Sequence, residues 1–244
     1  LYRGNPSLMD SQLTNAEIRY EYYFAREQRV TLAGFYKYID NPIEAYTSQS
    51  DSAINTSYAN APAATLYGVE VEVQKYIPTA AWDGPFWANR RFVIVANYTY
   101  TQSRIRVGAG DSTTINGTRL AASDFFFNGA PLTGQSDHLV NMQLGLEDTE
   151  SGSQQTLLIT YASPRVNSRG PSGQPDIQER PGFQLDFVAR QDLSIMGHDG
   201  ELKLEARNLT GRDYQEVQQY GANRITLNQY AVGTTITLGA TLKF

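Results

Sequence analysis

The sequence predicts an all-β protein, an antiparallel transmembrane β-barrel to which this chain contributes about nine strands. Nine segments alternate apolar and polar residues with a period of two, which is the pattern of a β-strand with two different faces. Short and long connections alternate between these segments, as they do in outer-membrane barrels. In most segments one row is apolar and the other carries charges, whereas a small soluble barrel packs apolar side chains inside.

The last segment, residues 230–244, shows the alternation most clearly. It is long enough to cross a bilayer at a tilt, and it has an aromatic residue at each end, where an interfacial anchor is favourable. Small and polar residues occupy the other row. We therefore expect a closing strand that ends in the periplasm. Counted back in twos from the C-terminus, the apolar row is Phe244, Leu242, Ala240, Leu238, Ile236, Thr234, Val232 and Tyr230.

Eight further strands are expected before it. The segment 64–77 is the clearest of them, because Tyr67, Val69 and Val71 alternate with acidic and small residues. The expected strands are 16–24, 29–39, 64–77, 91–106, 138–147, 155–163, 182–191 and 201–209.

The connections fall into two classes. Residues 25–28, 148–153 and 192–200 are short, and 78–90 is intermediate and contains both tryptophans. The long ones are rich in Gly, Pro, Ser and Asn, which favour turns and irregular loops. Short turns face the periplasm and long loops the exterior in outer-membrane barrels. The long loops are expected at 40–63, 107–137, 164–181 and 210–229.

Composition narrows the function. The 244 residues include no cysteine, which excludes a disulfide framework and Cys-based zinc sites. The net charge of −5 provides no broad basic surface, so nucleic acid is not an expected partner. The 16 tyrosines fit the aromatic girdles of a membrane barrel. A mean hydropathy of −0.43 is compatible with such a barrel, because alternating strands average out as polar.

An odd count of nine strands has a topological consequence. If the last strand runs down to the periplasm, the first also runs down and begins outside the cell. Single-chain bacterial barrels use even numbers, and an open sheet would leave two unpaired edges in lipid. We therefore expect residues 1–244 to be the C-terminal part of a larger barrel, or one chain of a split barrel.

Several short motifs resemble those of TonB-dependent outer-membrane receptors, in the order of that family and across nearly the whole chain. They are Gly4-Asn5-Pro6-Ser7-Leu8 ahead of Tyr20-Glu21-Tyr22-Tyr23-Phe24; Tyr67-Gly68-Val69-Glu70-Val71-Glu72; Ala96-Asn97-Tyr98-Thr99-Tyr100-Thr101; Asn208-Leu209-Thr210 with Tyr214; and Gly239 to Phe244.

This resemblance implies a barrel of 22 strands, an N-terminal plug inside it, and energy delivered by the TonB complex. The plug, the TonB box and the remaining strands are not in this sequence, so the same protein or a partner chain would supply them. Tyr230 and Phe244 resemble the terminal signal of the barrel-assembly machinery.

Three functions are open at this stage. The first is a receptor that captures a scarce ligand, most commonly an iron-siderophore, for TonB-driven uptake across the outer membrane. The second is a passive porin-like channel, which a full gene without a plug would favour. The third is a soluble secreted adhesin or binding module, which partitioning into water without detergent would favour. Outer-membrane lipid and lipopolysaccharide are expected neighbours, and Arg104 and Arg106 could pair with lipopolysaccharide phosphates.

Two sets of residues are candidates for function. Loop aromatics could stack on a ligand or, alternatively, pack one loop against another. Charges on the polar row would face the lumen, either as wall residues bonded to a plug and water or as a ligand path. The loop candidates are Tyr46, Tyr58, Phe125, Phe126, Phe127 and Tyr220. The lumen-wall candidates are Glu70, Glu72, Asp186, Arg190, Lys203, Glu205 and Arg207.

No enzyme activity is expected. Ser136, Asp137 and His138 include the residue types of a hydrolytic triad, but neighbours on one strand do not provide triad geometry. The only other histidine, His198, falls in a turn. No cofactor and no metal site are predicted.

Overall fold

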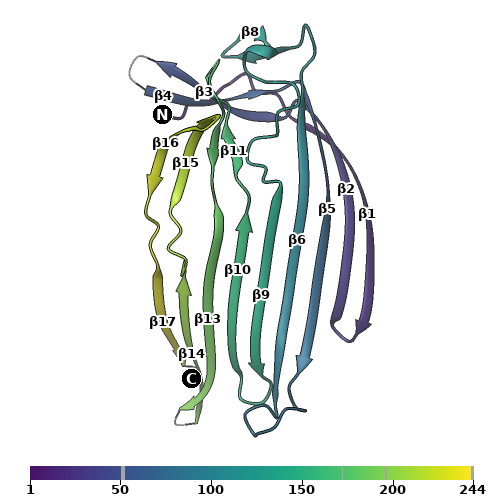
Figure 1. Ribbon diagram of the computed structural model, residues 1–244, viewed down its shortest axis with the longest axis vertical. Helices are drawn as coiled ribbons and strands as arrows, with labels where there is room; N and C mark the ends of the chain where they lie inside the picture. Colours follow the sequence, from purple (N-terminus) through teal and green to yellow (C-terminus); the bar gives the residue numbers. More distant parts are fainter. Residues whose placement is uncertain (51–52, 172, 196, 243–244) are drawn as a thin grey trace.

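The computed structural model describes residues 1–50, 53–171, 173–195 and 197–242, and its main feature is a curved antiparallel sheet of nine long strands (Figure 1). The nine strands lie in chain order, each hydrogen-bonded to the next. The sequence-based prediction of about nine antiparallel strands is thereby confirmed. The strands are β1 (Gln12–Ala25), β2 (Gln28–Asp40), β5 (Ala63–Pro78), β6 (Arg90–Arg106), β9 (His138–Asp148), β10 (Ser153–Ala162), β13 (Gly182–Ile195), β14 (His198–Arg207) and β17 (Thr235–Leu242).

The connections alternate between the two ends of this sheet. Short turns join β1 to β2 and β9 to β10, and residues 79–89 join β5 to β6; these lie at one end, here called the turn end. The long connections 41–62, 107–137, 163–181 and 208–234 gather at the opposite end, here called the loop end (Figure 1). No helix among the described residues is long and apolar enough to cross a membrane.

The long connections lie where the sequence predicted long loops, and they contain short paired strands that the sequence pattern did not indicate. Backbone amides and carbonyls in a compact layer need partners, and hairpins provide them. Ile43–Ser50 pairs with Ala53–Asn60, Ser112–Ile115 pairs with Thr118–Ala121, and four short strands build a separate sheet. These elements are β3 (Ile43–Ser50), β4 (Ala53–Asn60), β7 (Ser112–Ile115), β8 (Thr118–Ala121), η1 (Ala122–Asp124), β11 (Arg165–Ser168), β12 (Ile177–Glu179), β15 (Tyr214–Tyr220) and β16 (Asn223–Tyr230).

The last strand is shorter than predicted. Tyr230 ends β16, where its ring stacks on Tyr214 at a centroid distance of 4.8 Å, and β17 begins only at Thr235. The strand is interrupted between Tyr230 and Thr235 because the Asn208 side chain donates a hydrogen bond to the carbonyl of Gly233. The backbone of Gly233 has a positive φ of 71°, which is not a strand conformation. The prediction of a single terminal strand over residues 230–244 was therefore wrong, and Phe244 lies outside the described residues.

The strand register lines up the apolar residues of neighbouring strands. One face of the sheet carries transverse apolar rows, and the other face carries polar and charged rows, as the two-residue period requires. One apolar row runs Tyr20, Leu32, Val71, Tyr98, Val140, Tyr161 and Phe183. The polar row beside it runs Glu21, Thr31, Glu72, Asn97, Asn141, Thr160 and Gln184.

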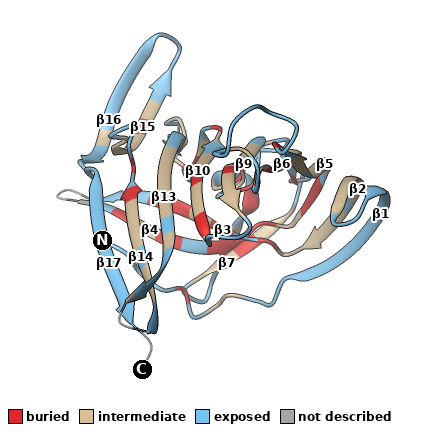
Figure 2. Ribbon diagram, turned by 90° about the horizontal axis from the view of Figure 1, so that it is seen from below, coloured by how far each residue is buried: buried red, intermediate tan, exposed pale blue. Residues whose placement is uncertain are grey.

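The buried apolar core lies at the loop end. Leu66 and Ile105, on the polar face of β5 and β6, pack with Tyr46 and Phe126 from the long connections. Viewed along the strands, β3, β4 and β7 lie on the concave side of the sheet (Figure 2). The long connections therefore cover Leu66 and Ile105, the apolar residues that lie on the polar face near the loop end.

The sheet is open. β1 and β17 each pair on one side only within the part of the chain that the structure describes. Both strands are exposed along their whole length. Both also run from the loop end to the turn end (Figure 1).

Candidate functional site

The hairpins and segments at the loop end, here called the loop layer, are tied together by one buried arginine. The Arg169 side chain is fully buried, and its guanidinium donates to Glu44 (2.6 Å), to Asp176 (2.8 Å) and to the carbonyl oxygen of Pro131. These partners come from the three connections 41–62, 107–137 and 163–181. A buried guanidinium with several acceptors fixes the relative positions of the segments that supply them, because its planar donors bond well in one arrangement of those acceptors.

The backbone around Arg169 reinforces this junction. Its amide donates to Ala45, and its carbonyl accepts from both the amide and the hydroxyl of Thr47. Burial raises the pKa of the Glu44 carboxyl, and Arg169 and the amide of Thr133 oppose that shift. The β3–β4 hairpin is thus held by backbone pairing and by an ion pair together.

Asn5 forms a second junction. Its side-chain amide donates to the carbonyls of Tyr58 (3.0 Å) and Thr114 (3.1 Å), and its oxygen accepts from the amides of Ser7 (3.0 Å) and Asn116 (3.1 Å). An asparagine side chain can make about four such bonds, so this one is fully used. It joins the N-terminal segment to the β3–β4 and β7–β8 hairpins.

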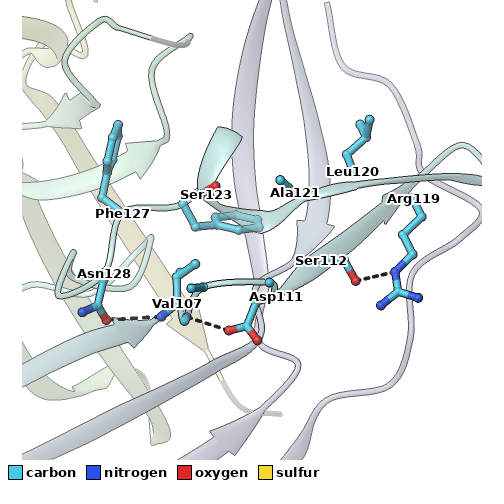
Figure 3. Close-up of a pocket in the computed structure, with 13 residues that line it drawn as sticks. Val107, Asp111, Ser112, Arg119, Leu120, Ala121, Ser123, Phe127 and Asn128 are labelled. Atoms are coloured by element: carbon cyan, nitrogen blue, oxygen red, sulfur yellow. Dashed lines mark hydrogen bonds between the residues drawn. The ribbon is translucent and has the colours of Figure 1, made fainter.

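A pocket of about 660 Å³ opens in the loop layer beside β7, β8 and η1 (Figure 3). Asp111 lines this pocket and accepts a hydrogen bond from the amide of Gly108 at 2.7 Å. Arg119 donates through Nε to the Ser112 hydroxyl at 2.7 Å, which leaves its terminal nitrogens for a ligand. The ring of Phe127 stands on the opposite side of the pocket and is 55% exposed. An anionic or aromatic ligand matches this lining.

The six loop aromatics do not converge on one site. Phe126 and Tyr46 are buried in the core, and Phe125 packs edge-on against Tyr46 at 5.2 Å. Tyr220 lies at the tip of the β15–β16 hairpin and is 79% exposed. Phe127 lines the pocket of Figure 3, while Tyr58 lines a separate pocket of about 290 Å³. Three of the six therefore pack loop against loop, which was the alternative interpretation.

The seven wall candidates all lie on the polar face, and most are paired there. Glu72 accepts from Arg29 at 2.7 Å, and Glu70 accepts from Asn97. Lys203 and Arg207 flank Glu205 on the same strand, and both form ion pairs with it. Asp186 accepts from the backbone amide of Asn208 at 2.6 Å, and Arg190 lies in register with Lys203.

The Ser–Asp–His combination does not form a triad. The Ser136 hydroxyl is buried and donates to the carbonyl of Ser163, whereas His138 Nδ1 faces the hydroxyl of Tyr98 at 2.9 Å. His198 lies at the start of β14. The described residues contain no group of three His, Cys, Asp or Glu side chains that could hold a metal ion.

The loop junctions could not be predicted from the local sequence pattern. Arg169 is one arginine in a loop rich in Pro, Gly and Ser, and nothing in the local pattern distinguishes it from a solvated residue. Asn5 belongs to one of the motifs that carry the family resemblance, but its spacing assigns it no partner. Arg119 and Asp111 were likewise not candidates, because their pocket is formed only when residues 107–128 fold into a hairpin.

A curved antiparallel sheet that is apolar on its convex face and polar on its concave face, with turns at one end and folded loops at the other, has the features of a bacterial outer-membrane β-barrel. A family model described as TonB dependent receptor-like, beta-barrel matches residues 1–236. The chain belongs to this family of outer-membrane transport receptors, as the motifs predicted. Comparison with curated proteins and with solved structures gives no match.

Proposed function

We propose that this chain is the C-terminal part of a receptor that captures a scarce ligand, an iron-siderophore first among the candidates, for TonB-driven uptake. The loop end faces the exterior, the C-terminus the periplasm, and the polar face lines the lumen. The remaining strands, which would complete a barrel of about 22, and the plug come from the same protein or from a partner chain, and the barrel-assembly machinery inserts it.

One observation carries this proposal. The β3–β4 hairpin and β7 lie over the concave side of the sheet (Figure 2), and the loop layer contains a pocket of about 660 Å³. A passive channel needs an open mouth, whereas a receptor needs a shaped surface there. The paired charges of the polar face suit a wall that contacts a plug and water.

Arg119 and Phe127 are the proposed contacts. An aromatic ring and a guanidinium with free donors would recognise the anionic or aromatic metal-chelating groups of a siderophore. Their positions are fixed by the hairpin and by η1, so binding would require little reorganisation of the loop layer.

The test uses the whole protein in cells grown under iron limitation, with radiolabelled ferric-hydroxamate and ferric-catecholate complexes as probes. Uptake of one complex should saturate and should stop when an uncoupler removes the proton motive force, while binding at the cell surface persists. Uptake that is unsaturable and indifferent to the uncoupler would instead establish a passive channel.

Variants locate the site within the loop layer. Arg119→Ala and Phe127→Ala should each weaken surface binding by about tenfold, as loss of one charge-assisted or stacking contact would. Arg26→Ala and Phe86→Ala, which change the same residue types at the turn end, should bind as the unaltered protein does. Equal effects of both sets would contradict a site at the loop end.

A further inference from the structure

A second depression lies on the apolar face, outside the loop layer. It measures about 620 Å³ and crosses the middle of β1 and β2 and the half of β5 and β6 that is nearer the loop end. Its lining is largely apolar and includes Ile18, Gly34, Tyr36, Tyr67, Val69 and Tyr100. Tyrosines at this level are what an interfacial girdle provides, so the depression would lie in the leaflet nearest the loops.

Gly34 produces the depression, and Gly68 on the neighbouring strand belongs to the opposite, polar face. Gly34 lies in the apolar row, and a Cβ atom there would meet only the Ile18 side chain at an ordinary 3.8 Å. Packing therefore does not require glycine at 34, and the missing side chain leaves the hollow. At Gly68 a Cβ would lie 2.2 Å from the Tyr100 carbonyl, so glycine is required there. The ring of Phe35 covers Gly68 on the other face, which keeps the wall closed.

Two arginines lie above this hollow on the same face. Arg104 and Arg106 continue the row of Tyr100 along β6, and Arg104 is about 13 Å further along the strand at ~3.3 Å per residue. Both are exposed, and neither forms a hydrogen bond or ion pair with another residue that the structure describes. Asp40, aligned with Arg106 through Ala63, is the one carboxylate aligned with them in the register, so the patch stays cationic.

We propose that this surface is a binding site for lipopolysaccharide, with one acyl chain in the hollow at Gly34 and the phosphates on Arg104 and Arg106. The arginines lie nearer the loop end than the hollow does. This order matches lipopolysaccharide, whose phosphates lie closer to the cell exterior than its acyl chains. Within hydrocarbon there is no hydrophobic gain, so selectivity would come from packing in a fixed groove and from charge-assisted hydrogen bonds. The proposal rests on the orientation given above, in which the loop end faces outward.

The test measures retained lipid by native mass spectrometry on the whole receptor in detergent. Purified bisphosphorylated lipid A is the probe, and phosphatidylglycerol is the competing phospholipid. Arg104→Gln with Arg106→Gln, and separately Gly34→Leu, should each lower lipid A retention by about tenfold. Binding in detergent needs neither ligand nor TonB, so failure here is separable from failure of the transport proposal.

Matched variants control for general damage. Arg26→Gln removes a cation at the turn end, and Ala96→Leu adds an apolar side chain lower on the same face; both should retain lipid A fully. Unchanged retention in Gly34→Leu would overturn the groove, and unchanged retention in the double arginine variant would overturn the phosphate contacts. Equal loss of phosphatidylglycerol and lipid A in Gly34→Leu would overturn the assignment to lipopolysaccharide.

Discussion

Replacing Arg169 by Met should release the loop layer while leaving the long strands in place. The substitution removes the donors to Glu44, Asp176 and Pro131 and keeps an apolar stem of similar length. The carboxylate of Glu44, which is 1% exposed, would then be buried without its partner. Breaking a buried ion pair by removing one partner costs about 3–5 kcal/mol.

Amide hydrogen exchange on the whole receptor measures this cost locally. The reporter amides are those of Thr47, Arg169 and Thr133, because each is hydrogen-bonded within the junction. A loss of ~3–5 kcal/mol corresponds to exchange faster by about a hundredfold to a few thousandfold. Amides in the middle of β9 and β10 should keep their protection, since no junction contact reaches them.

Arg165→Met is the matched control in the same connection. Arg165 pairs with Glu179 through two bonds of 2.9 and 3.0 Å, but its side chain is 33% exposed. A pair open to solvent contributes about 0.2–1 kcal/mol, so exchange at the reporter amides should change less than about fivefold. If Arg169→Met changed those amides no more than Arg165→Met does, the buried ion pair would not hold the loop layer.

Three further changes test other parts of the structure. Burial raises the pKa of Glu44 above its ordinary 4.5, so the folded loop layer binds this proton more tightly than the unfolded chain. This contribution of Glu44 to stability is complete below a pH of about 4.5 and is lost as the pH rises through the raised pKa. The protection factors of the reporter amides should therefore increase on mild acidification, and Glu44→Gln should make them less dependent on pH. Gly68→Ala should lower the yield of heat-resistant, folded barrel on gels, because its Cβ would collide with the Tyr100 carbonyl, while Gly34→Ala should not; equal yields would contradict the packing. Asn208→Ala loses four side-chain hydrogen bonds of a residue with a φ of 53° and should cost about 1–3 kcal/mol, measured as faster protease cleavage in the β15–β16 hairpin on whole cells; unchanged cleavage would show that Asn208 does not hold the base of that hairpin.

The long strands could be predicted from the sequence because one physical rule governs them. From residue 67 to residue 74 the side chains meet lipid-like and polar surroundings in alternation, so the two-residue period appears directly in the sequence. The predicted bounds of that strand, 64–77, differ from the observed Ala63–Pro78 by one residue at each end. The pattern changes near the loop end, where apolar residues also lie on the polar face. Leu66 and Ile105 face inward and are apolar because the loop layer covers them.

The loop layer could not be predicted in the same way. Its stability comes from contacts between segments far apart in the chain, such as Arg169 with Glu44, and no local period records such a contact. The start of the last strand was predicted wrongly for a related reason. Residues 230–234 keep the alternation of 235–242, but Asn208 binds the carbonyl of Gly233 and ends the pairing there. The loop aromatics could not be sorted from the sequence either, since Phe126 packs in the core and also lines the pocket beside Phe127.

The measurement that tests the receptor assignment most directly is the polypeptide mass of the native protein in purified outer membranes, detected with an antibody to residues 210–229. A single chain much larger than 27.2 kDa is predicted, because the plug and the other strands would be part of it. A stably inserted chain of about 27.2 kDa, with no partner chain recovered beside it, would contradict both the strand count of the barrel and its function as a TonB-driven receptor.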